Sequence, residues 1–365
     1  MKRLGNIFDK ICTMENLREA HENARKGKRK YGGVKMVDRD PEKYLKQIQD
    51  MLVNKTYEVS PYTIKDLFDG GKPRILMKLP YYPDRIIQWA IMLQIRHVFM
   101  SVFVHHTCAS VRGRGIHQAT KLMNEYMRDK EKSQYCLKID VAKFYPSINH
   151  EILKSLLRRK FKDPDLLELL DKIIDSLDAF PSSPQSGRPG MPDAQGIPIG
   201  SYLSQYLANY YLSYFDHWLK ETQGAKYVVR YMDDIVILSD SKEWLHALKC
   251  KIDDYLTENL KLRLKDNWQV FPTGVRGVDF VGYRHFYGFK LLRKSSAKRF
   301  KRKMSSIRKK TAARKPINYH DFCAYNSYIG WLKWCDSFRL IQKHADPLAN
   351  VIQTYYENKI RKESA

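Results

Sequence analysis

The sequence lacks any hydrophobic run long enough to cross a bilayer, because its longest apolar stretches are short ones such as YVV and IVIL. Its N-terminal segment, MKRLGNIFDKICTMENLREA, carries charges throughout and has no continuous apolar region of the kind found in a signal peptide. Its six cysteines include no Cys-x-x-Cys pair, and no histidine lies at zinc-site spacing from them. We therefore expect a cytoplasmic protein with reduced cysteines and no membrane partner.

Acidic residues are scarce relative to basic ones: 65 lysines and arginines face 40 aspartates and glutamates, which gives a formal net charge of +25. The imbalance is concentrated in residues 290–315, which hold thirteen basic residues and no acid. Like charges at helical neighbour spacing repel one another, which disfavours a merely solvated helix face. The pattern favours contact with a nucleic-acid backbone. An anionic membrane surface would satisfy the same charge, but the interleaved aromatic residues fit nucleic acid better.

The chain shows no internal repeat, and its patterns divide it into three parts. Residues 1–134 are expected to be mostly helical, with one strand within 71–83. From 135 to 286 the expected order is strand, helix, loop, helix, strand, strand, helix and hairpin, with a loop and helix insertion at about 160–195. Residues 287–365 are basic and expected to be helical. This order is typical of an α+β fold in which helices pack on one face of an antiparallel sheet.

Two adjacent acids interrupt the strongly apolar stretch YVVRYMDDIVILSD. We expect strand, tight turn and strand here, with Asp233 and Asp234 at the tip. A third acid, Asp140, ends another expected strand, YCLKID. An Asp-rich turn would explain an isolated pair, because Asp is common in turns. Three such carboxylates in a basic protein instead favour Mg²⁺ ions, which can stabilise the entering and leaving oxygens of a displacement at phosphorus.

Two motifs resemble those of a known family. RYMDDIVILSD resembles the metal-binding hairpin of reverse transcriptases, and LKIDVAKFYPSI resembles their first carboxylate motif. The resemblance extends from about Lys72 to Leu340, and the motifs in this order are far more specific than YMDD alone. It implies an RNA-directed DNA polymerase shaped as a right hand. The three parts above would be fingers with the N-terminal segment, a palm with a ferredoxin-like antiparallel sheet, and a helical thumb.

The resemblance also implies roles for individual residues. Lys72 and Arg74 would grip the triphosphate, although surface cations before a strand would look the same. Tyr145 would form a gate beneath the sugar, unless it is only a core aromatic. The implied assignments are Asp140, Asp233 and Asp234 as catalytic residues; these three and the Val141 carbonyl as metal ligands; Lys72, Arg74, Tyr145, Ile199, Gly200 and Gln205 as nucleotide-binding residues; and Arg112, Arg114, Gly282, Tyr283, Lys298, Arg299, Lys301 and Arg302 as nucleic-acid-binding residues. For Arg112 and Arg114, a flexible basic loop is a nearly equal alternative.

One segment points to a subfamily. Group II intron enzymes usually carry Gln-Gly-x-x-x-Ser-Pro where this chain reads IGSYLSQ, with Ile199 at the Gln position and Gln205 at the Pro position. This pattern is similar to that of diversity-generating retroelement reverse transcriptases, as are DFVGYRHFYGFKLL and SYIGWLKWCDSFRL. Within the 365 residues we see no maturase-like or endonuclease extension, which favours the same subfamily. Its enzymes copy template adenines with errors and thereby diversify a target gene.

The resemblance implies particular ligands and partners: two Mg²⁺ ions, which Mn²⁺ can replace, a template RNA, a primer or cDNA, deoxynucleoside triphosphates and a small basic accessory protein. Related enzymes usually have a Lys after a Leu-x-Leu pattern as a candidate proton donor. Here Asn267 lies near that place and Lys265 two residues early, so we assign no general acid. Retron, group II intron and defence-type reverse transcriptases remain alternatives. An inactive RNA-binding protein is disfavoured, because clustered like charges without a function cost stability.

Overall fold

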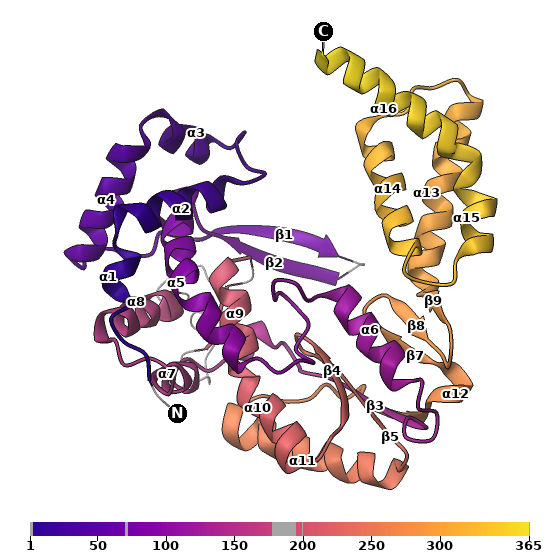
Figure 1. Cartoon of the computed structure of the whole chain (residues 1–365), viewed down its shortest axis with the longest axis horizontal. Coiled ribbons are helices and arrows are strands. Elements are labelled where there is room, and N and C mark those ends of the chain that lie inside the picture. Colours follow the sequence, from indigo (N-terminus) through magenta and orange to yellow (C-terminus); the bar gives the residue numbers. More distant parts are fainter. Residues whose placement is uncertain (1–2, 70–71, 177–194, 199, 365) are drawn as a thin grey trace.

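The computed structural model describes residues 3–69, 72–176, 195–198 and 200–364. A helical N-terminal part carries a β-hairpin, a four-stranded sheet lies in the middle of the chain, and a bundle of helices ends it (Figure 1). The expected α+β composition is therefore confirmed. In these described ranges no helix is both long and apolar enough to cross a membrane.

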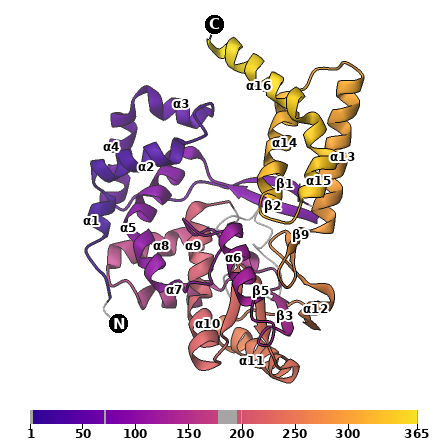
Figure 2. The same cartoon turned by 45° about the vertical axis from the view of Figure 1, so that its right-hand side comes forward.

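The N-terminal helices pack around α5 (Ile86–Val102), which is apolar on nearly all sides. Ile87, Ile91 and other residues along its length are buried in the main core. The antiparallel hairpin of β1 (Thr63–Asp69) and β2 (Lys72–Lys78) projects from these helices toward the C-terminal bundle in both views (Figures 1 and 2). The other elements of this part are α1 (Phe8–Ile11), α2 (Met14–Arg25), α3 (Gly32–Arg39), α4 (Pro41–Val53) and a π-helical turn (Tyr81–Arg85).

The central sheet has four strands, β3 (Tyr135–Asp140), β4 (Tyr227–Tyr231), β5 (Asp234–Ser239) and β6 (Gln269–Pro272). Their order in space is β4-β5-β3-β6, and every neighbouring pair is antiparallel. Helices connect β3 to β4 and β5 to β6, whereas β4 and β5 form a hairpin. This is the connectivity of a ferredoxin-like βαββαβ unit, and it places β3 and β5 side by side in the middle of the sheet.

Helices cover both faces of the sheet. Leu137 points into the main core, which includes buried residues of α11 (Lys242–Leu260). Its neighbour Cys136 points the other way and packs with α6 (Ile116–Tyr126). The prediction of helices on one face was wrong, because strands such as IVIL are apolar at consecutive positions and bury both faces. The remaining helices of this part are α7 (His150–Arg158), α8 (Pro164–Asp175), α9 (Tyr202–Tyr211), α10 (Ser213–His217), two short turns (Tyr145–Ser147 and Trp218–Thr222) and α12 (Thr273–Arg276).

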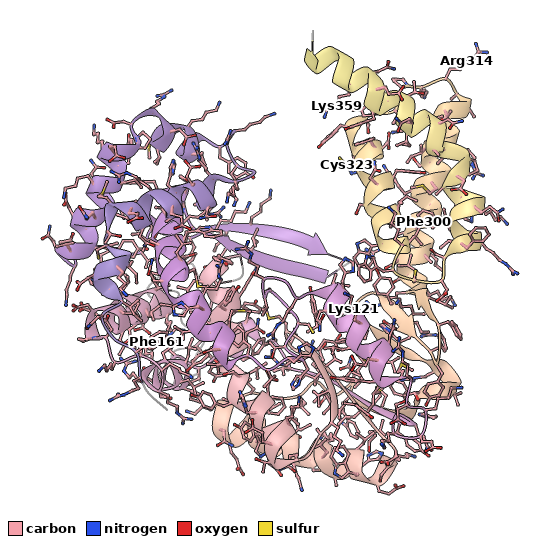
Figure 3. All side chains as sticks on the ribbon, in the orientation of Figure 1. Lys121, Phe161, Phe300, Arg314, Cys323 and Lys359 are labelled. Atoms are coloured by element: carbon pink, nitrogen blue, oxygen red, sulfur yellow. The ribbon has the colours of Figure 1, made fainter. Side chains whose placement is uncertain are left out.

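The C-terminal part has a core of its own. Phe300 lies at its centre and is fully buried (Figure 3). A three-stranded sheet of β7 (Val278–Phe280), β8 (Tyr283–His285) and β9 (Lys290–Leu292) leads into it. Because β9 pairs with β8, this sheet continues past the boundary predicted at residue 287. The helices of this part are α13 (Lys294–Ala312), α14 (Tyr319–Leu332), α15 (Phe338–His344) and α16 (Ala349–Ser364), with a 3₁₀ turn at Asp346–Leu348.

Asp163 ties the start of the chain to α8. Its Oδ1 accepts a hydrogen bond from the Leu166 N–H at 3.2 Å and so caps the helix. Its Oδ2 accepts from the N–H groups of Ile7 and Phe8 at 2.6 and 3.0 Å. Burial opposes ionisation of this carboxyl, but the N–H donors outweigh it and hold its pKa below the ordinary value. The predicted insertion at about 160–195 thus contains α8, whereas 177–194 lie outside the described residues.

We expect Asp163→Ala to lower the free energy of unfolding by about 2–4 kcal/mol, because it removes a helix cap and leaves two buried N–H groups without an acceptor. Asp163→Asn keeps a capping oxygen and is the matched control. Urea unfolding at pH 7 measures both. An Asp163→Ala protein that is as stable as wild type would show that this carboxylate does not anchor the N-terminus.

Candidate active site

The register of the central sheet brings the three predicted carboxylates together. Asp140, the last residue of β3, is the direct pairing partner of Asp234, the first residue of β5. Side chains at paired positions lie on the same face of a sheet. Asp233 precedes Asp234 in a tight turn, and its carbonyl accepts a hydrogen bond from the Val141 N–H at 3.2 Å. The turn depends on Met232, which adopts a left-handed backbone conformation with φ of 59°.

Lys265 lies between two of the carboxylates. Its Nζ donates to Asp140 Oδ1 and lies 4.0 Å from Asp233 Oδ2. Its backbone N–H donates to the Asp140 carbonyl at 2.8 Å, which fixes it beside β3. Burial, together with the negative charge of Asp140, raises the pKa of the Asp233 carboxyl to about 6, although Lys265 opposes this shift. One ammonium group therefore does not balance both acids.

A second lysine, Lys138, lies beside Asp234. Asp234 Oδ2 lies 3.5 Å from Lys138 Nζ, which also donates to the Asp279 carbonyl at 2.6 Å. Asp234 Oδ1 is buried and has no hydrogen-bond partner among the described residues. Burial raises the pKa of the Asp234 carboxyl to about 6; Lys138 counteracts this shift and Asp140 adds to it. An ionised, buried oxygen without a donor needs a cation.

The chemistry of these groups fits a magnesium site. Within the described ranges, no group of three or more His, Cys, Asp and Glu side chains forms a preassembled cage for a metal ion. Mg²⁺ does not require such a cage, because it usually takes one or two carboxylates and completes its shell with water and substrate phosphates. The unpartnered Oδ1 of Asp234 and the neighbouring Asp140 carboxylate are ligands of the required kind.

A cavity of about 480 Å³ opens beside Asp140. Three guanidinium groups line it, those of Arg276, Arg284 and Arg293. Asp279 orients Arg293 by accepting from its Nε at 2.6 Å. A cavity lined by Asp140 and several cations suits a polyanionic ligand that arrives with a divalent cation.

Tyr145 stands next to the acidic turn. Its hydroxyl lies 3.9 Å from Met232 Sδ, and burial together with the Asp233 charge raises the pKa of Tyr145 above its ordinary value. Its neighbour Phe144 is only 3% exposed and belongs to the core. The structure thus separates a core aromatic from one at the candidate site, whereas the gating role of Tyr145 stays a prediction.

Gly200 and Gln205 line a pocket of about 340 Å³ between β2, α5 and α9. Gly200 has φ of 116°, and a Cβ there would lie 2.8 Å from a methyl carbon of Leu76, so any other residue would strain the backbone and displace this methyl group. Ile199 lies outside the described residues, as do the side chains of Lys72 and Arg74 on β2. The pocket also contains Lys28, Arg85, Gln88 and a stacked pair, Trp89 and Tyr202.

Two predicted nucleic-acid contacts are used inside the protein. Arg114 donates from Nη1 to the carbonyls of Val104 and Thr107 at 2.6 and 3.2 Å, so it braces its own loop, whereas Arg112 is exposed. Tyr283 is fully buried and donates to the Trp331 carbonyl at 3.0 Å. The side chain of Tyr283 is thus enclosed in the protein, whereas Arg114 is only half-buried, and the nucleic-acid contacts predicted for these two residues stay predictions.

The packing of the β7–β8 turn explains why position 282 is a glycine. Gly282 has φ of 89°, and a Cβ at this position would lie 2.4 Å from the Trp331 ring. The glycine thus lets the β7–β8 turn contact α14. Its predicted contact with nucleic acid can involve only the backbone.

The basic helix α13 keeps its predicted cations at the surface. Lys298, Arg299, Lys301 and Arg302 are all exposed. A groove of about 520 Å³ runs beside them and is lined by Arg302, Ser305, Ser306, Lys309, Lys310, Ala313 and Lys315. Figure 3 shows Arg314 at the far end of the same bundle, with its side chain pointing outward.

Two functional candidates were missed or left open by the sequence. Lys138 was not singled out, although a residue two positions before Asp140 in a strand must lie on the same face as the acid. Lys265 was left unassigned because its spacing departs from related enzymes. Its contact with Asp140 depends on the pairing of residues 263–265 with the end of β3, a long-range feature that spacing alone does not show.

Comparison with known proteins agrees with these features. Residues 65–285 match the family model described as reverse transcriptase (RNA-dependent DNA polymerase). Protein YkfC of Escherichia coli strain K12 is 24% identical over 282 residues, which cover 66% of this chain and 70% of that protein. The COX1/OXI3 intron 2 protein of Saccharomyces cerevisiae is 25% identical over 203 residues, which cover 51% of this chain and 21% of that protein.

Among solved structures, apo telomerase from Candida tropicalis matches 84% of this chain with a TM-score of 0.48 and 12% identity. Telomerase from Candida albicans, in complex with a fragment of telomeric RNA, matches 72% with a TM-score of 0.47 and 12% identity. The chain spans 59% and 55% of the lengths of these two proteins.

We expect Asp234→Asn to raise the free energy of unfolding at pH 7.5, without divalent cations, by about 1–2 kcal/mol. A carboxyl whose pKa is raised on folding makes the folded state progressively less stable as the pH rises from the unfolded pKa of about 4 to the folded value of about 6. Asp234→Asn removes this penalty, so its stability falls less between pH 5 and pH 7.5. Urea unfolding across this range measures the difference, and the exposed neighbour variant Asp266→Asn is the control. A destabilised Asp234→Asn protein would contradict the electrostatic account of the site.

Proposed function

Because the chain belongs to the reverse transcriptase (RNA-dependent DNA polymerase) family, and is thus an enzyme of the RNA-directed DNA polymerase class, we propose that it copies an RNA template into DNA at the Asp140, Asp233 and Asp234 site. The observation that carries this proposal is the pairing of Asp140 with Asp234, beside the turn that holds Asp233. A primer 3′-hydroxyl would attack the α-phosphorus of a deoxynucleoside triphosphate and release pyrophosphate.

The proposed metal ligands are the carboxylates of Asp140, Asp233 and Asp234 and the carbonyl of Val141. When bound, two Mg²⁺ ions, or Mn²⁺ in their place, supply the positive charge that stabilises the entering and leaving oxygens. The protein contributes the rest: the sheet register holds Asp140 against Asp234, and Oδ1 of Asp234 is buried. Lys265 would hold the Asp140 carboxylate in place and Lys138 that of Asp234.

The architecture supports an assignment of fingers, palm and thumb. The sheet β4-β5-β3-β6 with its helices would be the palm, because it carries the acids. The β1–β2 hairpin and the N-terminal helices would be the fingers, with Lys72 and Arg74 placed by β2 and Tyr145 beside the nucleotide sugar. The bundle from α13 to α16 would be the thumb.

Positive charge marks a proposed path for template and primer. The exposed cations of α13 and the groove beside them suit a phosphate backbone. The pocket at Gly200 and Gln205 combines two cations with the stacked rings of Trp89 and Tyr202, which suits a nucleotide. Arg112 stays a candidate template contact because it is exposed.

We further propose that the enzyme belongs to the diversity-generating retroelement type and makes errors opposite template adenines. The sequence IGSYLSQ supports this, since Ile199 lacks the hydrogen-bonding amide of the usual Gln. The proposed partner is a small basic accessory protein that shares the RNA with it. The match to a yeast intron protein keeps a group II intron-type enzyme as the second candidate. A template repeat that differs from a nearby gene at adenines would separate the two.

Primer extension on an RNA template tests the general proposal. We expect wild-type protein with Mg²⁺ to extend the primer and Asp233→Asn to lose activity about 1,000-fold, equivalent to about 4 kcal/mol of transition-state free energy. Asp266→Asn should keep wild-type activity, because its carboxylate is exposed and outside the site. Extension by Asp233→Asn at the wild-type rate would refute the assignment of the site.

Sequencing of the cDNA products tests the subtype. We expect Ile199→Gln to change the misincorporation rate opposite template adenine more than opposite the other three bases, because the amide restores a polar constraint near the base pair. Ile199→Val, which adds no hydrogen-bonding group, is the control. The same error spectrum in wild type and Ile199→Gln would rule out this explanation of infidelity.

A further inference from the structure

Arg230 is buried where a charged side chain is rarely found. It lies on β4, directly before the acidic turn, and is 0% exposed. It is also one of the largest fully buried side chains in the described part of the protein. A buried guanidinium is stable only when its donors are satisfied, so the groups around it show what it holds.

All three nitrogens of the Arg230 guanidinium donate hydrogen bonds. Nε and Nη2 donate to the two oxygens of Asp216 at 2.7 and 2.6 Å, in a bidentate pair. Nη1 donates to Asn209 Oδ1 at 3.1 Å and to the Met232 carbonyl at 2.9 Å. The Arg230 side chain therefore joins the turn before Asp233 to helices α9 and α10.

Asp216 is itself held in place. It is fully buried, and Thr107 Oγ1 donates to its Oδ2 at 2.9 Å. Burial opposes its ionisation, but Arg230 and His106 outweigh this and lower the pKa of Asp216 far below the ordinary value. The backbone of the Thr107 segment also pairs with that of Arg230. Asp216 is thus an ionised anchor with a fixed orientation.

Two consecutive carbonyls of the Met232–Asp233 turn accept hydrogen bonds from other parts of the chain. Arg230 holds the carbonyl of Met232, and the Val141 N–H holds that of Asp233. Met232 has φ of 59°, a conformation that costs a side-chain-bearing residue about 1–3 kcal/mol and persists only when its surroundings impose it. Release of the Met232 carbonyl would let the turn relax and re-aim the carboxylate that follows.

We propose that Arg230, oriented by Asp216, is a positioning residue that fixes the Met232–Asp233 turn and thereby sets the metal affinity of the candidate site. The inference rests on the proposed function. A contribution to stability does not by itself explain why Arg230 and Asp216 are buried here, because a buried ion pair can often be replaced by apolar residues of similar volume with little loss of stability. What apolar residues cannot supply is a donor to the Met232 carbonyl.

Two variants separate positioning from stability. Arg230→Lys keeps the charge beside Asp216 but lacks the planar fork that reaches Asp216 and Met232 at once. Arg230→Met combined with Asp216→Leu removes both charges, so it should recover most of the stability lost in Arg230→Met alone. For each folded variant, the melting temperature, the Mn²⁺ dissociation constant by electron paramagnetic resonance and the primer-extension rate are measured.

We expect both variants to fold, to bind Mn²⁺ about 10- to 100-fold more weakly than wild type and to extend primers more slowly, the scale typical of partners that orient metal ligands. Mn²⁺ binding within threefold of wild type in either folded variant would overturn the proposal. Should the double variant fail to fold, the Mn²⁺ affinity of Arg230→Lys alone tests the proposal. A wild-type protein that binds Mn²⁺ but does not extend primers would refute the proposed function and leave the binding comparison intact.

Discussion

The repulsion among three carboxylates is the constraint on which the central part of this protein depends. The pairing of β3 with β5 forces Asp140 and Asp234 onto the same face, and the turn adds Asp233 beside them. Burial then raises the pKa values of Asp233 and Asp234 to about 6. Such an arrangement lowers the stability of the folded protein at neutral pH, so folding alone does not explain it, and this supports the catalytic role that we propose.

The surrounding structure restrains these acids with cations and backbone groups. Lys265 donates to Asp140, Lys138 lies beside Asp234, and buried Arg230 donates to the Met232 carbonyl in the turn. The two lysines do not fully balance the negative charge of the three carboxylates, since Asp234 Oδ1 still has no hydrogen-bond partner among the described residues. The site is thus rigid in its backbone and still able to accept further positive charge, as a site for divalent cations requires.

The sequence predicted the acidic hairpin, the strand ending in Asp140 and the basic helix, because these depend on local patterns and on a specific family resemblance. It could not predict contacts made by long-range pairing. Lys265 meets Asp140 only through the register of residues 263–265, and Tyr283 and Arg114 turned inward because folding gave them carbonyl partners. It also missed the second covered face of the sheet, which is covered by α6, the helix that directly precedes β3 in the chain.

The most direct test of the central claim is anomalous diffraction from crystals of the protein grown with Mn²⁺, a primer–template and a non-reactive deoxynucleotide analogue. The account predicts manganese bound by carboxylate oxygens of Asp140 and of the Asp233–Asp234 pair, with Lys265 displaced from Asp140. Manganese bound elsewhere, with these three carboxylates still paired only to their lysines, would contradict it.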